Sequence, residues 1–160
     1  FLMRWPGRIP AGTEIDGAVS HFDIFATASA AAAAKIPETA AIDGVDLLPY
    51  IEGGKTGQPH TALYWRSGNY RAVLKDGWKL QSVKRTNAVM LFNLNADPTE
   101  QNDTAGREPG KVAELNALLA GHDADSVAPG WPALFDSPIP IDRPLGTAPR
   151  DGETYIYWSN

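Results

Sequence analysis

The sequence predicts an α+β protein in which a four-stranded antiparallel sheet packs against a helix. Two observations carry this prediction. Four short segments rich in β-branched, aromatic and aliphatic residues follow one another between residues 62 and 94, with turn residues between them. A segment with apolar residues at helical spacing comes next, at residues 111–120, and strands followed by a helix are typical of this fold class.

The composition is that of a globular protein. The 160 residues suffice for one ordinary domain, and 43% of them are hydrophobic while 21% are charged. A net charge of −5 argues against nucleic acid as a partner, because binding to it needs a basic surface. No run approaches 18 apolar residues, so no membrane span is expected, and the chain has no cysteine for a disulfide, thiolate metal site or nucleophile.

The N-terminal region predicts a strand and an alanine-rich helix. The apolar opening, residues 1–4, reads as a strand already under way, and we expect that sequence is missing before it. Residues 23–34 predict a helix, because alanine favours helix and because Ser20 and Asp23 have the spacing of a capping pair. Pro37 should end it, since proline disfavours a helical residue before it.

The middle of the chain predicts one helical turn and then the sheet. The turn is expected within residues 46–50, in a long loop. The four strands are expected at residues 62–66, 70–74, 78–82 and 90–94. The second helix is expected at residues 111–120, with Gly121 as its C-terminal stop, followed from residue 127 by an extended tail rich in proline and glycine.

The hairpin between the second and third strands admits two registers. A two-residue Asp-Gly loop mixes charged and apolar groups on each face, whereas a three-residue loop at residues 75–77 gathers apolar groups on one face. Because a slip by one residue exchanges the faces, burial should decide. We expect the three-residue loop, with Gly77 left-handed at a bulge. The face of Leu74, Trp78 and Leu80 should then pack on a helix face formed by Val112, Leu115 and Leu119.

The residues alone do not reveal a catalytic site. His21, His60 and His122 share no metal-binding spacing, and no GxSxG motif occurs, although a Ser–His–Asp arrangement set by geometry stays open. His21 lies beside the expected helix start and His60 lies in a polar loop. Carboxylate pairs lie near turns, where Asp normally caps structure: Asp43 with Asp46, Asp97 with Glu100, and Asp123 with Asp125.

Seven short motifs follow one another along the chain: residues 5–9 (WPGRI), 19–27 (VSHFDIFAT), 42–49 (IDGVDLLP), 63–66 (LYWR), 70–73 (YRAV), 77–80 (GWKL) and 91–100 (LFNLNADPTE). In this order they resemble the latter part of a type I sulfatase, of the alkaline-phosphatase-like superfamily, with Ala26 where proline is common. Each motif alone is weak, and the ordered series carries the resemblance. It implies that residues 1–50 end an alkaline-phosphatase-like α/β domain, that residues 51–126 form a C-terminal sheet with a helix, and that residues 127–160 are a tail.

The resemblance also implies a chemistry that this chain does not contain. Similar enzymes hydrolyse sulfate esters with a formylglycine made from Cys or Ser in a [CS]xPxR signature, and they bind calcium. The chain lacks that signature and has no match to the calcium ligands. No catalytic or metal residue is therefore assigned, calcium and formylglycine are implied for the parent enzyme only, and the fragment alone is expected to be inactive.

The sheet of such folds packs on the catalytic domain and helps to wall the substrate cleft. Trp65, Arg66 and Arg71 are therefore candidate substrate-binding residues, since Arg suits an anion and Trp suits a sugar or aryl ring. The implied partners are the missing N-terminal catalytic portion and a sulfated small molecule or sulfated glycan. The compartment is not fixed, although a periplasmic or secreted parent fits the family. Two alternatives are a related phosphodiesterase or phosphonate monoester hydrolase and an autonomous carbohydrate-binding module.

Overall fold

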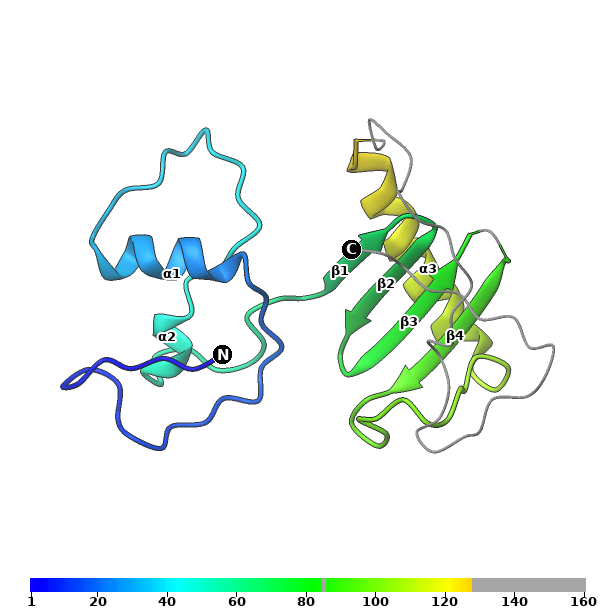
Figure 1. Cartoon of the computed structure of the whole chain (residues 1–160), viewed down its shortest axis with the longest axis horizontal. Helices are drawn as coiled ribbons and strands as arrows, with labels where there is room; N and C mark the ends of the chain where they lie inside the picture. Colours follow the sequence, from blue (N-terminus) through cyan, green and yellow to red (C-terminus); the bar gives the residue numbers. More distant parts are fainter. Residues whose placement is uncertain (85, 128–160) are drawn as a thin grey trace. The chain divides into compact units, whose positions relative to one another are not determined.

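The computed structural model describes residues 1–84 and 86–127, which divide into two compact units with the boundary after Thr61 (Figure 1). The first unit holds two helices, α1 (Asp23–Ala31) and α2 (Leu48–Ile51). The second unit holds β1 (Leu63–Ser67), β2 (Tyr70–Lys75), β3 (Trp78–Val83), β4 (Ala88–Asn93) and α3 (Pro109–Asp125). Residues 51–61 fall in the first unit, and the three-part division expected from sequence stays a prediction. Nearly all of the expected tail lies outside the described residues.

The expected strand at residues 1–4 is wrong. No residue of the first unit is in a strand, and the side chains of Phe1 and Leu2 are exposed. A strand forms only where a neighbouring chain satisfies its backbone hydrogen bonds, and residues 1–61 supply no such neighbour. The segment is therefore apolar and has no sheet to join.

Helix α1 ends at Ala31, three residues earlier than expected. Ala33 has a left-handed φ of 52°, and the N–H of Ala34 donates to the carbonyl of Ser29. This is the hydrogen-bonding pattern of a Schellman motif, which usually has glycine at the left-handed position. The chain reversal within the alanine run, rather than Pro37, ends the helix.

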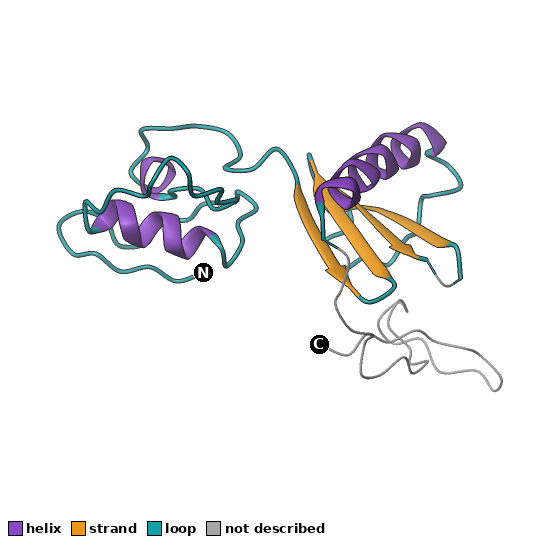
Figure 2. Ribbon diagram, turned by 90° about the horizontal axis from the view of Figure 1, so that it is seen from above, coloured by secondary structure: helices purple, strands orange, loops and turns teal. Residues whose placement is uncertain are grey.

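The predicted four-stranded sheet and the helix that packs on it are confirmed. The strands pair antiparallel in the order β1-β2-β3-β4, and α3 lies along one face (Figure 2). The core lies between them, where Val73, Leu80 and Leu91 of the sheet pack against Leu115 and Leu119 of α3. Burial of such side chains stabilises the fold by about 1.5–3 kcal/mol each.

The expected three-residue loop between β2 and β3 is also wrong. Lys75 pairs with Trp78, so that the loop is the dipeptide Asp76-Gly77. Both residues have positive φ, 51° for Asp76 and 77° for Gly77, as a type I′ turn requires. The N–H of Leu94 donates to the carbonyl of Gly77 at 2.7 Å, which fixes the turn against the chain after β4.

Burial does not select this register, because both faces of the sheet are apolar. Val73 pairs with Leu80 in the core under α3, and both are 0% exposed. Leu74 is half-buried and points to the opposite face, where Ala72 and Phe92 are buried. Since either register buries an apolar set, the type I′ preference of Asp-Gly decides between them. Val73 thus takes the place expected for Leu74, while Trp78 and Leu80 do face α3.

Helix α3 is longer than expected and runs through Gly121 to Asp125. It ends at Ser126, whose hydroxyl donates to the carbonyl of His122 at 2.7 Å and whose N–H donates to that of Asp123. The expectation that Gly121 stops the helix is therefore wrong, because Ser126 supplies the partners that satisfy the last carbonyls. Among the described residues, no helix combines the length and the apolar character needed to cross a membrane.

Candidate functional site

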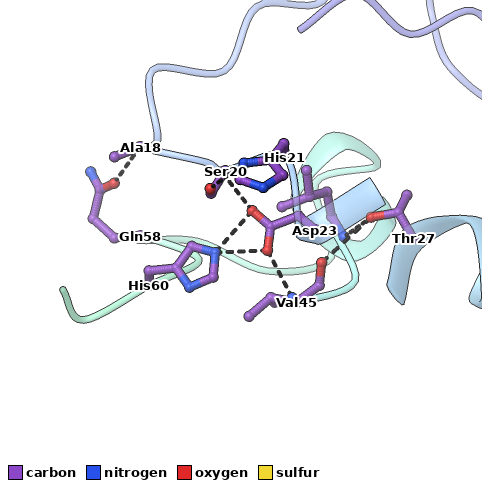
Figure 3. A network of polar contacts seen from close by, with 9 residues as sticks. Ala18, Ser20, His21, Asp23, Thr27, Val45, Gln58 and His60 are labelled. Carbon is purple, nitrogen blue, oxygen red and sulfur yellow. Dashed lines mark hydrogen bonds and ion pairs between the residues drawn. The ribbon is translucent and has the colours of Figure 1, made fainter. Parts of the chain in front are cut away.

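A buried carboxylate at the start of α1 joins three segments of the chain (Figure 3). Asp23 is 0% exposed. One carboxylate oxygen accepts the N–H of Ser20 at 2.7 Å, and the other accepts the N–H of Val45 at 2.9 Å. The Nε2 atom of His60 lies 2.9 Å from both oxygens. Asp23 thereby holds together the chain that leads into α1, the chain before α2 and the chain that leads to β1.

The local sequence permits this close approach. A Cβ atom at Gly44 would lie 2.3 Å from the carbonyl oxygen of Phe22, so only glycine fits beside the start of α1. One turn along α1, the hydroxyl of Thr27 accepts the N–H of Leu47 at 3.1 Å. Asp23 and Thr27 therefore fix the chain before α2 along the side of α1. One of the two hydrogen bonds of the expected capping pair is present. Asp23 accepts the N–H of Ser20, as the acidic residue of a capping box does.

The hydrogen bonds keep Asp23 ionised. Burial acts to raise the pKa of Asp23, but the backbone N–H groups of Ser20 and Val45 and the ring of His60 outweigh it, so that the pKa is lowered. An ionised carboxylate only accepts hydrogen bonds, so Nε2 of His60 carries a proton and points it at Asp23. The edge of the His60 ring meets the ring of Phe22, with centroids 5.5 Å apart.

An Asp–His pair of this kind orients the general base of many hydrolases. Within the described residues no hydroxyl is bonded to His60, and the Ser20 hydroxyl lies 3.5 Å from Nδ1 of His21 instead. Nor does any group of three His, Cys, Asp or Glu side chains in residues 1–84 and 86–127 have the arrangement of a metal site. What the observed contacts of Asp23 do is to join segments of the first unit.

The three residues predicted to bind substrate lie together in β1 and β2 but not on one face. Trp65 pairs with Ala72, and Arg66 pairs with Arg71. Side chains alternate between the two faces along a strand. Arg71 therefore shares the α3 face with Val73, and Arg66 lies on that face as well. Trp65 points to the opposite face and is 42% exposed.

The two arginines are both engaged within the second unit. Arg71 forms an ion pair with Asp123 of α3, and its side chain is 14% exposed. Arg66 donates from Nη2 to the carbonyl of Val127 at 2.7 Å. Arg66 and Arg71 lie opposite each other in the sheet, where like charges repel. Asp123 offsets the charge of Arg71. Arg71 is thus held by α3, while Arg66 remains partly exposed at the edge of the sheet.

Trp65 borders a hollow of about 410 Å³ on the sheet face that points away from α3. Ala72 forms part of its floor, and Trp65, Leu74 and Lys79 line it. The Nζ atom of Lys79 lies 2.6 Å from a carboxylate oxygen of Glu100. Arg66 also lines it, so that the hollow combines an aromatic surface with two cations, of which Lys79 has an acidic partner.

Comparison with known proteins decides the family. No protein-family model matches the chain. Rat steryl-sulfatase is 31% identical over 156 residues, which cover 95% of this chain and 25% of the relative. The N-acetylgalactosamine-6-O-sulfatase of Bacteroides thetaiotaomicron is 28% identical over 133 residues, which cover 74% of this chain and 26% of the relative. The chain belongs to the sulfatase family.

The fold agrees with this assignment. The crystal structure of Ps i-CgsB superposes with a TM-score of 0.67 and 24% identity, covering 80% of this chain and 29% of that chain. The chain spans about a quarter of the length of the curated sulfatases described here. Its antiparallel sheet and helix are consistent with the C-terminal region of the sulfatase fold.

The motifs that resemble sulfatases contact one another in this sulfatase chain. Asp23 and Thr27 of the second motif bind Val45 and Leu47 of the third. Glu100, at the end of the last motif, has a positive φ of 56° and accepts hydrogen bonds from Lys79 and Gln81 of β3. The motifs thus mark contacts between segments, and the carboxylate pair Asp97–Glu100 belongs to them.

His60 is the residue of this cluster that sequence reasoning missed. It lies 37 residues from Asp23 and in none of the seven motifs. The sequence places it in a polar loop and indicates no role for it, yet its side chain is 9% exposed. A single sequence carries no signal for a contact at this separation.

Proposed function

We propose that this chain is the C-terminal portion of an enzyme that hydrolyses sulfate esters. The observation that carries the proposal is the match of 95% of the chain to a quarter of a steryl-sulfatase. The substrate is a sulfated small molecule or a sulfated glycan, because the relatives are named for both kinds. Their names favour sulfate over phosphate esters for the parent enzyme.

The reactive groups belong to the rest of the parent. The described residues offer no cluster that fits calcium, and the sequence has no [CS]xPxR signature for formylglycine. In the parent, formylglycine would supply the nucleophile and calcium would stabilise the sulfate oxygens. This chain contributes a surface that docks on the catalytic portion and side chains that line the substrate cleft.

The first unit is proposed to dock on the N-terminal catalytic portion. Nine large hydrophobic side chains are exposed in the described residues, and only Trp65 and Val127 of these lie in the second unit. The other seven form what we call the docking surface: Phe1, Leu2, Met3, Ile15, Ile24, Phe25 and Ile42. Apolar exposure concentrated in one unit is typical of an interface, and the relatives are about four times as long as this chain.

A hollow in the first unit supports the same proposal. It measures about 420 Å³ and is lined largely by apolar side chains, among them Met3, Ile9, Val19, Leu47 and Ile51. An apolar hollow beside an exposed apolar segment suits the insertion of side chains from another part of the enzyme. The occupant proposed here is the catalytic portion of the same polypeptide.

The second unit is proposed to contribute to the substrate cleft. Trp65 is exposed and offers a ring surface, while Arg66 offers a cation at the sheet edge. Arg71 stays in the proposal as the third residue, and its ion pair with Asp123 makes it the most firmly held of them. Trp65→Ala in the parent should raise KM for an aryl sulfate more than it lowers kcat.

The proposed role of the docking surface can be tested by placing a charged side chain on it. Because the docking surface is exposed in the 160-residue chain, we expect that chain to self-associate. Phe25→Glu should reduce this self-association and should prevent the parent from assembling an active enzyme. Ala117→Glu is the control, because Ala117 is exposed on α3 and lies outside the docking surface. Light scattering of the chain and hydrolysis of p-nitrophenyl sulfate by the parent are the two measurements. If both variants keep the activity of the parent, the docking proposal is wrong.

The preference of the parent enzyme for sulfate over phosphate esters tests the proposed function. The parent should hydrolyse p-nitrophenyl sulfate faster than p-nitrophenyl phosphate by a wide margin. Faster turnover of the phosphate ester would replace the proposal with a phosphoesterase of the same superfamily.

A further inference from the structure

The sheet face opposite α3 carries the hollow of about 410 Å³, beside an exposed tryptophan. Trp65 lies directly opposite Ala72 in the β1–β2 pairing, and Leu74 follows Ala72 by two residues in β2. Paired residues and residues two apart point to the same face, so these three side chains share it. Ala72 is small and 1% exposed, while Trp65 is 42% exposed. The indole therefore forms one wall of a hollow whose floor is apolar.

A lysine on the same face supplies hydrogen-bond donors in a fixed position. Lys79 pairs with Leu74 and lines the hollow. Its Nζ atom lies 2.6 Å from one carboxylate oxygen of Glu100, and the other oxygen accepts the side-chain amide of the buried Gln81. Glu100 thus holds Lys79 in place and offsets its charge. An ammonium has three N–H groups, and within the described part of the chain Glu100 takes one, so that others can donate to a ligand.

These groups suit an uncharged ring that carries hydroxyls. The electron-rich face of an indole attracts the weakly positive C–H groups of a sugar ring. The paired Lys79 offers N–H groups to hydroxyls, but the carboxylate of Glu100 beside it opposes the binding of an anion. A purely apolar ring would leave those donors without partners. Arg66 starts from the α3 face and binds the carbonyl of Val127, so it borders the hollow at the sheet edge.

We propose that the hollow is a carbohydrate-binding site that takes a neutral pyranose ring. The ring lies over Ala72 with the C–H groups of one face against the indole of Trp65, and a hydroxyl accepts an N–H of Lys79. The site assigns the second unit to the glycan and not to the sulfate group. The proposal goes beyond the proposed function, because binding needs only side chains of the second unit and involves no hydrolysis.

Saturation-transfer difference NMR of the 160-residue chain with methyl β-D-galactopyranoside tests the site, because this sugar presents several C–H groups on one ring face. The method observes the sugar and therefore works even when the chain self-associates. Saturation should reach the protons of one ring face most strongly. Trp65→Ala should weaken binding about tenfold, while Trp65→Phe should keep most of it because a ring remains. Lys79→Met should weaken binding about threefold through the lost hydrogen bond.

Trp5→Ala is the control and should leave binding unchanged, because Trp5 is a half-buried tryptophan of the first unit that does not line the hollow. Absence of binding, or equal binding by Trp65→Ala and the original chain, would overturn the proposal. Tighter binding of phenyl sulfate would assign the hollow to an aryl ring, and displacement of the sugar by potassium sulfate at constant ionic strength would assign it to an anion. Either result would also overturn the proposal. Failure of sugar binding leaves the proposed function intact, and a parent that hydrolyses no sulfate ester leaves the sugar site intact.

Discussion

The Nε2 atom of His60 lies 2.9 Å from both carboxylate oxygens of Asp23, a residue 37 positions earlier in the chain. Asp23 also accepts the N–H groups of Ser20 and Val45, so that one buried side chain satisfies donors from three segments. A buried charge is tolerated only when it is paired and hydrogen-bonded in this way. The stability of the first unit should depend strongly on this carboxylate.

Asp23→Ala should lower the free energy of unfolding by about 3 kcal/mol, because it leaves two partly buried backbone donors and the His60 ring without their acceptor. Urea unfolding of the 160-residue chain at pH 7 measures the change. Asp43→Ala is the control, since Asp43 is exposed and its removal should cost little. A loss below about 1 kcal/mol for Asp23→Ala would show that the cluster contributes little to stability.

The carboxylate of Asp23 should make the stability of the folded chain depend on pH. The pKa of Asp23 in the folded chain is lowered from its ordinary value of 3.8, so the folded state holds the ionised form more strongly than the unfolded state does. This stabilisation is present in full above about pH 4 and is lost as pH falls through the lowered pKa. Asp23→Asn should be less stable at pH 7 and should lack this part of the acid transition. Urea midpoints between pH 2 and pH 7 compare the two chains, and parallel curves would contradict the assignment.

Glu114 of α3 provides a separate titration in the second unit. Hydrogen bonds from Lys111 and from Lys75 lower the pKa of Glu114 from 4.5 to about 2. Its contribution to stability is therefore present above pH 4.5 and is lost as pH falls toward 2. Lys75→Met should raise the pKa of Glu114 but leave it below 4.5, because Lys111 remains. NMR titration of the Glu114 side-chain carboxyl measures this, and an unchanged midpoint in Lys75→Met would exclude the Lys75 contact in solution.

Adding a single methyl group at Gly77 in the β2–β3 turn should destabilise the fold. Gly77→Ala places an L-residue at φ 77°, and its Cβ would meet the side chain of Asn95 at 2.2 Å. Asn95 can move, so the backbone strain should dominate and lower the free energy of unfolding by about 1–2 kcal/mol. Gly106→Ala is the control, because a Cβ there meets nothing within 4 Å. Equal stability of the two variants would contradict the observed turn.

The strands and the packing of α3 follow from patterns that a sequence carries locally. Runs of β-branched, aromatic and aliphatic residues between turn residues mark the strands, and helical spacing marks the apolar face of α3. The register between β2 and β3 is not available in the same way, because Leu74 and Val73 are both apolar and either face can be buried. In that case the turn residues Asp76 and Gly77 decided the pairing.

The wrong predictions for the end of α3 and for residues 1–4 have a related cause. Gly121 looked like a helix stop, but the helix ends where Ser126 binds the carbonyl of His122, a contact that the residue type of Gly121 does not encode. The predicted strand at residues 1–4 has no partner in the described chain. The contact between Asp23 and His60 depends on the path of the whole first unit, which local patterns do not contain.

We propose that this chain shapes a sulfatase without supplying the reacting groups. The direct test is hydrolysis of p-nitrophenyl sulfate, measured with calcium and after co-expression with a formylglycine-generating enzyme. The 160-residue chain should show no turnover above a control preparation, and the longer polypeptide that carries it should show turnover. Turnover by the 160-residue chain alone, or none by the longer polypeptide, would contradict the claim.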